Sequence, residues 1–113
     1  MRHLRKKKIG KGRDHARKLV RTLAASAIVY EKIQTTSARA KIARVLVEQM
    51  ITKAKKDDLH NKRQIFSALP LNAARKTIEV LGPRYKERHG GYTRILRLGK
   101  SKDGMPKVQL ELV

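Results

Sequence analysis

Apolar residues recur at a helical period over most of the first eighty positions, and this pattern predicts four helices. Asp14, Thr36 and Asp58 are suitable N-caps for the first, second and third helix. The third ends before Pro70, and a glycine at position 82 followed by proline ends the fourth. The positions expected to face the core are Ala16, Leu19, Val20, Leu23, Ala24, Ala27 and Ile28 in the first helix, Ala38, Ile42, Val45, Leu46 and Met50 in the second, Leu59, Ile65, Phe66 and Leu69 in the third, and Leu71, Ala74, Ile78 and Leu81 in the fourth.

Short segments that break the helical period predict strands at residues 31–36, 92–98 and 107–112. The last two are joined by a segment whose Asp-Gly pair at 103–104 signals a turn. In the final strand apolar residues alternate with polar ones, so one face packs on helices while the other meets water. The sequence therefore predicts an α+β fold: a small mixed or antiparallel sheet of about three strands with helices on one face, in a single domain over residues 14–113.

Charge changes this picture most. The chain contains 29 lysines and arginines but only 9 acidic residues, for a net charge of +20. Residues 1–21 hold 10 basic residues and one acid, and residues 84–102 hold seven and one. Residues 1–13 have too few apolar side chains to order alone and are predicted to form a basic arm. A body with this much like charge needs a polyanion as partner, either nucleic acid or an anionic membrane.

Other compositional features bear on the cellular compartment of the protein. No apolar run approaches 18 residues, and no signal-peptide pattern is present, so we expect a cytoplasmic protein without membrane insertion. The absence of cysteine excludes disulfides and thiolate metal sites.

No group of residues predicts catalysis, a metal site or a cofactor. The four histidines lack the spacing of metal ligands. Asp57 and Asp58 are interpreted as a turn and helix cap rather than as a metal or acid–base pair. Ser26 and Ser37 lack the glycine elbow and the neighbouring groups of a nucleophile.

The glycine pair at 90–91 is neither a Walker loop nor a dinucleotide fingerprint, and it predicts a turn with positive φ that could bring the backbone close to a phosphate. Arg88, His89, Arg94 and Arg97 flank it and are expected to contact a polyanion. Tyr92 has two open interpretations, stacking on a base or ribose and packing within the sheet. With few aromatic residues, recognition should depend on phosphates and folded shape more than on sequence.

Several stretches resemble the bacterial large-subunit ribosomal protein seventeen family over essentially the whole chain: "MRH", "KIQTT", "MITKAKKDDLHNKRQ", "LGPRYKERHGGYTRILRLG" and "VQLELV". The resemblance implies a small α+β protein without catalytic activity, bound to large-subunit ribosomal RNA near the exit of the polypeptide tunnel. It also implies neighbouring large-subunit ribosomal proteins as partners, and no obligate homo-oligomer is expected. A free architectural nucleic-acid-binding protein and a small nuclease are the alternatives.

The resemblance also suggests RNA-contacting positions, although this chain departs from the family at Leu4, which interrupts a basic run, and at Arg13 and Asp14, where serines are more usual. The positions implied by the resemblance are Arg2, His3, His15, Arg17, Lys18, Arg21, Arg84, Arg88, Gly90, Gly91, Tyr92, Thr93 and Arg94. Charge and position add Arg5, Lys6, Lys7, Lys8, Lys11, Arg13, Arg39, His89 and Arg97.

Overall fold

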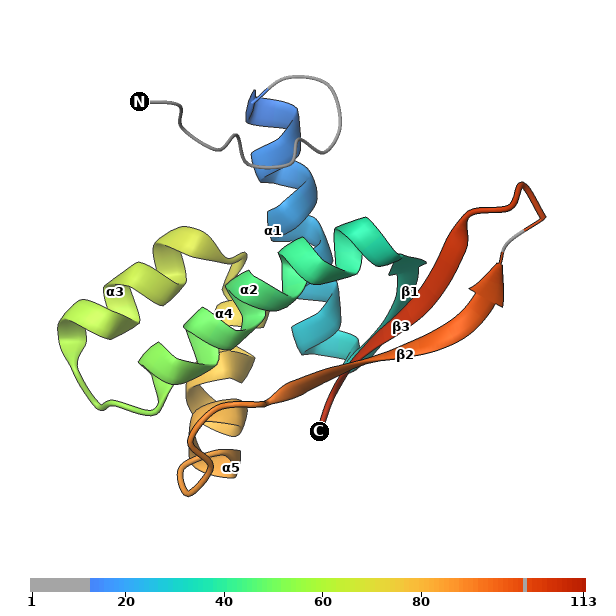
Figure 1. Cartoon of the computed structure of the whole chain (residues 1–113). Helices are drawn as coiled ribbons and strands as arrows, with labels where there is room; N and C mark the ends of the chain where they lie inside the picture. Colours follow the sequence, from blue (N-terminus) through green and yellow to red (C-terminus); the bar gives the residue numbers. More distant parts are fainter. Residues whose placement is uncertain (1–12, 101) are drawn as a thin grey trace, which may run out of the picture.

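The computed structural model describes residues 13–100 and 102–113, so the predicted basic arm lies almost wholly outside the described residues. Helices and a small sheet alternate along the chain (Figure 1). The elements are α1 (Arg13–Tyr30), β1 (Lys32–Thr36), α2 (Ser37–Ala54), α3 (Leu59–Ala68), α4 (Leu71–Lys76), η1 (Thr77–Leu81), α5 (Gly82–Arg84), β2 (Thr93–Lys100) and β3 (Pro106–Leu112).

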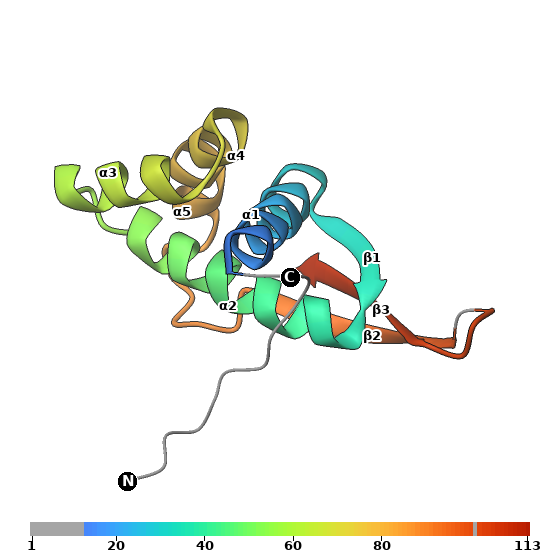
Figure 2. The same ribbon diagram turned by 90° about the horizontal axis from the view of Figure 1, so that it is seen from above.

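The sheet has three antiparallel strands in the order β1-β3-β2, which confirms the predicted α+β class. Leu110 on the central strand is paired with Ile33 on one side and Ile95 on the other, so these three side chains share one face. Helices α1 and α2 cover that face, and the hairpin of β2 and β3 extends beyond them (Figures 1 and 2). Val108 and Leu110 are buried, as the alternation in the last strand predicts.

Small side chains let α1 and α2 pack closely. In α1, Ala24, Ala27 and Ile28 are fully buried, and in α2 the same is true of Ala40 and Ala43. Alanine at a helix contact allows two backbones to approach, while the larger residues fill the space beside them. The amino-terminal half of α1 projects past this contact (Figure 1), so its expected core positions are only partly buried.

The predicted inward face of α2 is shifted by about one position, although Met50 is buried as predicted. Val45 is 56% exposed, whereas Val47 and Ile51 are fully buried. Apolar residues occur on more than one side of α2, so periodicity alone cannot select the buried side. The alanines select it, because α1 can approach only there.

The third and fourth helices also bury a narrower stripe than their sequences predict. Ile65 and Leu69 are buried as expected, but Phe66 is 44% exposed and Leu59 and Leu71 are more exposed still. These short helices pack on one side only, so apolar residues at the edge of the stripe remain in contact with solvent.

Two of the three predicted helix caps are confirmed. The Thr36 hydroxyl accepts a hydrogen bond from the Arg39 amide at 3.4 Å, and the Asp58 carboxylate accepts one from the His60 amide at 3.1 Å. Asp14 is not an N-cap, because α1 begins at Arg13 and places Asp14 within its first turn. A carboxylate there still interacts favourably with the helix dipole.

Gly82 does not end the fourth helix as predicted. The chain stays helical from α4 through the π-helical turn η1 to the end of α5, and the φ of Gly82 is −55°. A Cβ atom on this residue would lie 2.7 Å from the carbonyl oxygen of Ala54, at the end of α2. Glycine is therefore needed here for close packing of two backbones and not for a left-handed turn.

We predict that Gly82→Ala destabilises the protein by about 1–3 kcal/mol, because the added methyl group meets a backbone oxygen that cannot rotate away. Urea unfolding followed by circular dichroism would measure this change. Val80→Ala, at an exposed position in η1, is the control and should change stability by less than about 0.5 kcal/mol. Alanine normally favours a helix over glycine, so a stabilised Gly82→Ala variant would contradict the packing argument.

Candidate nucleic-acid interface

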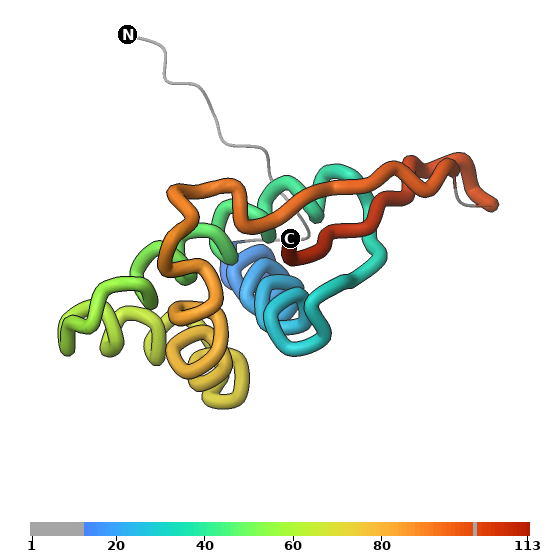
Figure 3. Tube along the Cα trace, turned by 90° about the horizontal axis from the view of Figure 1, so that it is seen from below, coloured from blue at the N-terminus to red at the C-terminus, as the bar shows by residue number. Residues whose placement is uncertain are grey.

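The glycine loop, defined as residues 85–92, connects α5 to β2 and passes beside the end of α2 (Figure 3). Gly90 and Gly91 have φ angles of 106° and 63°, which confirms the predicted positive-φ turn. Only glycine adopts this pair of conformations without strain, so the two residues allow the chain to reverse before the strand begins.

Lys55, at the end of α2, holds the glycine loop in place. Its ammonium group donates hydrogen bonds to the carbonyl oxygen of Arg88 and, at 2.8 Å, to the hydroxyl of Tyr92. It also lies 5.1 Å from the centroid of the Tyr92 ring, a cation–π distance. One half-buried lysine thus contacts two parts of the loop.

The Tyr92 side chain is part of the core and is only 2% exposed. Its ring lies 5.2 Å from that of Tyr85, at a tilted angle favourable for aromatic pairs. Burial raises the pKa of Tyr92, but the hydrogen bond from Lys55 and further polar contacts outweigh it and lower the pKa overall. Of the two interpretations from sequence, the structure supports packing, because no base can stack on a ring this buried.

The two ends of the glycine loop are fastened to the end of the chain and to α2. The hydroxyl of Tyr85 donates to the carbonyl oxygen of Val113 at 2.6 Å, and the amide of Val113 donates to the carbonyl of Tyr92 at 2.9 Å. The amide and hydroxyl of Thr93 both donate to the Glu48 carboxylate, at 3.2 and 3.1 Å. Thr93 is buried, so its side chain serves the fold.

The remaining residues of this region face solvent. Arg88, His89 and Gly91 are exposed, and so is Arg94, the second residue of β2. A guanidinium nitrogen of Arg88 lies 3.4 Å from the carbonyl oxygen of Gly91, a weak contact that leaves most donors of this side chain free for a ligand. The loop therefore presents cations and backbone rather than an aromatic platform.

Arg94 lies on the outer face of the sheet, opposite Glu111 in register. Its Nε donates to the Glu111 carboxylate at 2.6 Å, and this bond lowers the pKa of Glu111. The Arg94 side chain is 58% exposed, so it can contact a phosphate while it keeps its carboxylate partner.

Arg84 is placed differently from Arg88, because it forms an ion pair with Glu31 at the junction of α1 and β1. Lys76 contacts the same carboxylate at 3.2 Å and donates to the carbonyl of Val29 at 2.9 Å. Glu31 has a φ of 64°, unusual for a residue with a side chain, and these two cations hold it there. Arg84 thus joins the last helical turn to the start of the sheet.

The hydrogen bond from Arg84, assisted by Lys76, lowers the pKa of Glu31 below its ordinary value of 4.5. A lowered carboxyl pKa stabilises the fold above pH 4.5, and this stabilisation is lost as the pH falls through the folded-state pKa. We predict that Glu31→Gln lowers stability at pH 7 by less than about 1 kcal/mol, because the pair is partly exposed. The difference from the unmodified protein should be smaller at pH 3 than at pH 7, because the Glu31 carboxyl becomes protonated as the pH falls through its lowered folded-state pKa. Urea unfolding at both pH values measures it, with the exposed Glu79→Gln as control; a difference that persists undiminished in acid would contradict this assignment.

The basic residues predicted on the first helix form a separate surface. The exposed basic residues on the amino-terminal part of α1 are Arg13, His15, Arg17, Lys18 and Arg21. The Nε of Arg21 donates to the carbonyl of Ala68 in α3 at 2.9 Å. Figure 1 places the start of α1 and the glycine loop at opposite ends of the molecule.

Two further predicted residues, Arg39 in the first turn of α2 and Arg97 in β2, belong to neither of these surfaces. The predicted arm residues lie outside the described residues, namely Arg2, His3, Arg5, Lys6, Lys7, Lys8 and Lys11. The structure thus distributes the candidate residues over separate surfaces instead of gathering them in one patch.

The described part of the chain contains no cluster of three histidine or acidic side chains that could hold a metal ion. Over the same residues, no helix is both long and apolar enough to span a bilayer. Sequence reasoning did not identify Lys55 or Glu48, which position the glycine loop. Lys55 lies among other lysines, and nothing in the local sequence distinguishes it from them.

Comparison with known proteins decides the family. A family model described as Ribosomal protein L17 matches residues 19–113, most of the chain. The chain belongs to the ribosomal protein L17 family. Relatives named large ribosomal subunit protein bL17 agree over nearly their whole length: one from Caldanaerobacter subterraneus subsp. tengcongensis is 44% identical over 95% of this chain and 97% of its own. Those from Clostridium kluyveri and Carboxydothermus hydrogenoformans are 45% and 43% identical, over 95% and 94% of this chain and 96% of their own length.

Membership of the ribosomal protein L17 family gives the chain a structural, non-enzymatic role in the ribosome, and hence in the cytoplasm. This confirms the family suggested by the sequence motifs. The L17 match includes α2, the glycine loop and the entire sheet, so the elements that carry and position the loop are within the matched region.

Proposed function

We propose that this protein is a structural constituent of the large ribosomal subunit that binds large-subunit ribosomal RNA and bridges separate segments of it. The observation that carries the proposal is the placement of exposed cations at opposite ends of one body, on α1 and around the glycine loop. A single RNA helix would need cations along one face. Cations at both ends, held apart by a packed core, suit two RNA segments.

The mode of binding should depend on phosphates. The glycine loop and the adjoining start of β2 offer Arg88, Arg94 and backbone groups, while Tyr92 is buried. Contacts of this kind position RNA and depend strongly on salt, since each one releases counterions. The proposed location near the polypeptide tunnel exit rests on the resemblance to the family, and neighbouring large-subunit proteins are the other partners it implies.

Chemical footprinting of large-subunit ribosomal RNA with and without the protein tests the proposal. We expect protection in at least two segments that are separate in the RNA secondary structure, and retention of the protein on the subunit after a wash at moderate salt. Release at moderate salt, or equal affinity for duplex DNA, would instead indicate a free architectural nucleic-acid-binding protein.

A further inference from the structure

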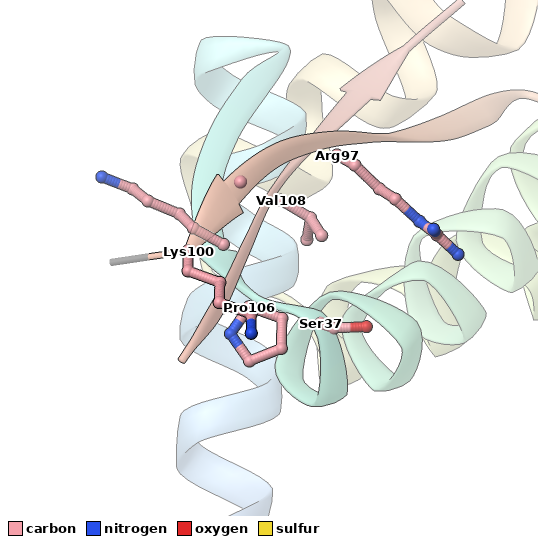
Figure 4. Close-up of a pocket in the computed structure, with 7 residues that line it drawn as sticks. Ser37, Arg97, Lys100, Pro106 and Val108 are labelled. Atoms are coloured by element: carbon pink, nitrogen blue, oxygen red, sulfur yellow. The ribbon is translucent and has the colours of Figure 1, made fainter. Parts of the chain in front are cut away.

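The hairpin of β2 and β3 carries a pocket on the side where it leaves the body of the protein. The pocket has a volume of about 380 Å³ and lies between the start of α2 and the two strands (Figure 4). Its floor includes the buried Val108. The residues that line it are Ser37, Arg97, Gly99, Lys100, Pro106, Lys107 and Val108.

The charge of this pocket is uncompensated within the described structure. Arg97, Lys100 and Lys107 line it together with neutral residues only. None of the ion pairs found among the described residues includes these three cations, whereas Arg84 and Arg94 each have a glutamate partner. Cations without acidic partners repel one another, so an external polyanion at this place would be favourable.

A β-bulge brings Lys100 to the pocket. Arg97 is paired with Val108 and Lys100 with Pro106, because the register shifts between Arg97 and Gly99. Val108 and Pro106 are two positions apart and so belong to the same face of the hairpin. In an unbulged strand, residues three apart face opposite sides, and Lys100 would lie on the outer face. Bulges commonly redirect a side chain in this way.

Arg97 and Lys100 are spaced along one face of the hairpin. Their cross-strand partners, Val108 and Pro106, are two residues apart on β3, a separation of about 7 Å along the strand. Figure 4 shows Arg97 on the side of the Ser37 hydroxyl and Lys100 near Pro106. A polyanion with successive charges along a backbone matches cations spaced along a strand better than a single small anion does.

We propose that an RNA backbone crosses the base of this hairpin and places successive phosphates against Arg97 and Lys100. This inference rests on the proposed role in ribosomal RNA binding and adds a contact distinct from α1 and the glycine loop. Its recognition is electrostatic, with no base read, because the pocket supplies cations, a hydroxyl and backbone but no aromatic side chain.

The test uses the full chain with the double substitution Arg97→Gln and Lys100→Gln. Affinity for large-subunit ribosomal RNA is measured over a series of salt concentrations. We expect the slope of log affinity against log salt to fall by about 1.4–1.8, at roughly 0.7–0.9 per lost phosphate contact. We also expect one protected RNA segment to disappear from the footprint. The control is a variant that combines Arg63→Gln with Arg75→Gln, at two exposed positions on α3 and α4. It removes the same charge elsewhere and should leave the salt slope and the footprint unchanged.

The outcomes separate this inference from the proposed function. Suppose that the hairpin variant leaves the salt slope and the footprint unchanged, while substitution in the glycine loop still abolishes RNA binding. That result would overturn the hairpin contact alone. If no variant affects RNA binding, both proposals fail. A further outcome is that inorganic phosphate shifts the amide resonances of Ser37 and Lys107 as strongly as RNA does. That result would indicate a small-anion site and would also overturn the proposal.

Discussion

Replacing Lys55 with methionine is expected to destabilise the protein by about 2–4 kcal/mol and to weaken its binding to ribosomal RNA. The ammonium group makes hydrogen bonds to the carbonyl of Arg88 and the hydroxyl of Tyr92, and each bond to a charged donor contributes about 1.5–3 kcal/mol. Methionine keeps the length of the side chain but removes both bonds, and leaves between the two acceptors only the bond from the Tyr92 hydroxyl to the Arg88 carbonyl, at 3.3 Å. The glycine loop would then lose its fixed path past α2, and with it the placement of Arg88 and His89.

The adjacent Lys56 provides a matched control, because Lys56→Met removes the same charge from an exposed side chain outside these contacts. It should change stability by less than about 0.5 kcal/mol. Urea unfolding and RNA titration of both variants make the comparison. Equal effects of the two substitutions would show that charge alone matters at the end of α2 and that Lys55 has no special part in holding the loop.

Reversing the charge at both Arg88 and Arg94, by substitution with glutamate, is expected to cause the largest loss of RNA affinity. Each lost phosphate contact should reduce the salt slope by about one unit, so the double variant should lose about two. Repulsion between the new carboxylates and phosphate oxygens weakens binding further. Titration of large-subunit ribosomal RNA at several salt concentrations measures both effects, and an unchanged slope would mean that these arginines face solvent in the complex.

Arg94 needs its own control because it is paired with Glu111. Arg94→Glu alone places two acids opposite each other in the sheet, which destabilises the hairpin. Combining it with Glu111→Arg restores an ion pair of reversed polarity. If the swapped variant regains stability but not RNA affinity, the position of the cation matters for binding. Full recovery of affinity would instead assign the effect of Arg94→Glu to loss of the ion pair.

The elements whose formation depends on local chemistry were predictable from the sequence. Thr36 and Asp58 cap helices because their side chains reach amides two or three residues further on, a distance set by the helix itself. Val108 and Leu110 are buried because a strand alternates its faces. Gly90 and Gly91 adopt positive φ, as a glycine pair in a turn favours.

The features that depend on another element were not predictable in the same way. Val45 is as apolar as Val47, and only the approach of α1 decides which of them is buried. Gly82 has the same local signal as a helix end, but the carbonyl of Ala54, far away in sequence, explains why glycine is needed. Lys55 resembles its neighbours until the glycine loop folds against it. The candidate site was thus found by its charge, while the residues that hold it in place were not.

The order of strands in the sheet has a consequence for how the protein is made. β3 is the central strand, yet it is synthesised after both of its neighbours, β1 and β2. Until β3 leaves the ribosome that translates it, neither edge strand has a partner, whereas α1 and α2 can already pack against each other. The nascent chain should therefore emerge as a helical intermediate with unpaired strands, and the sheet should close in a late step, once β3 has been translated.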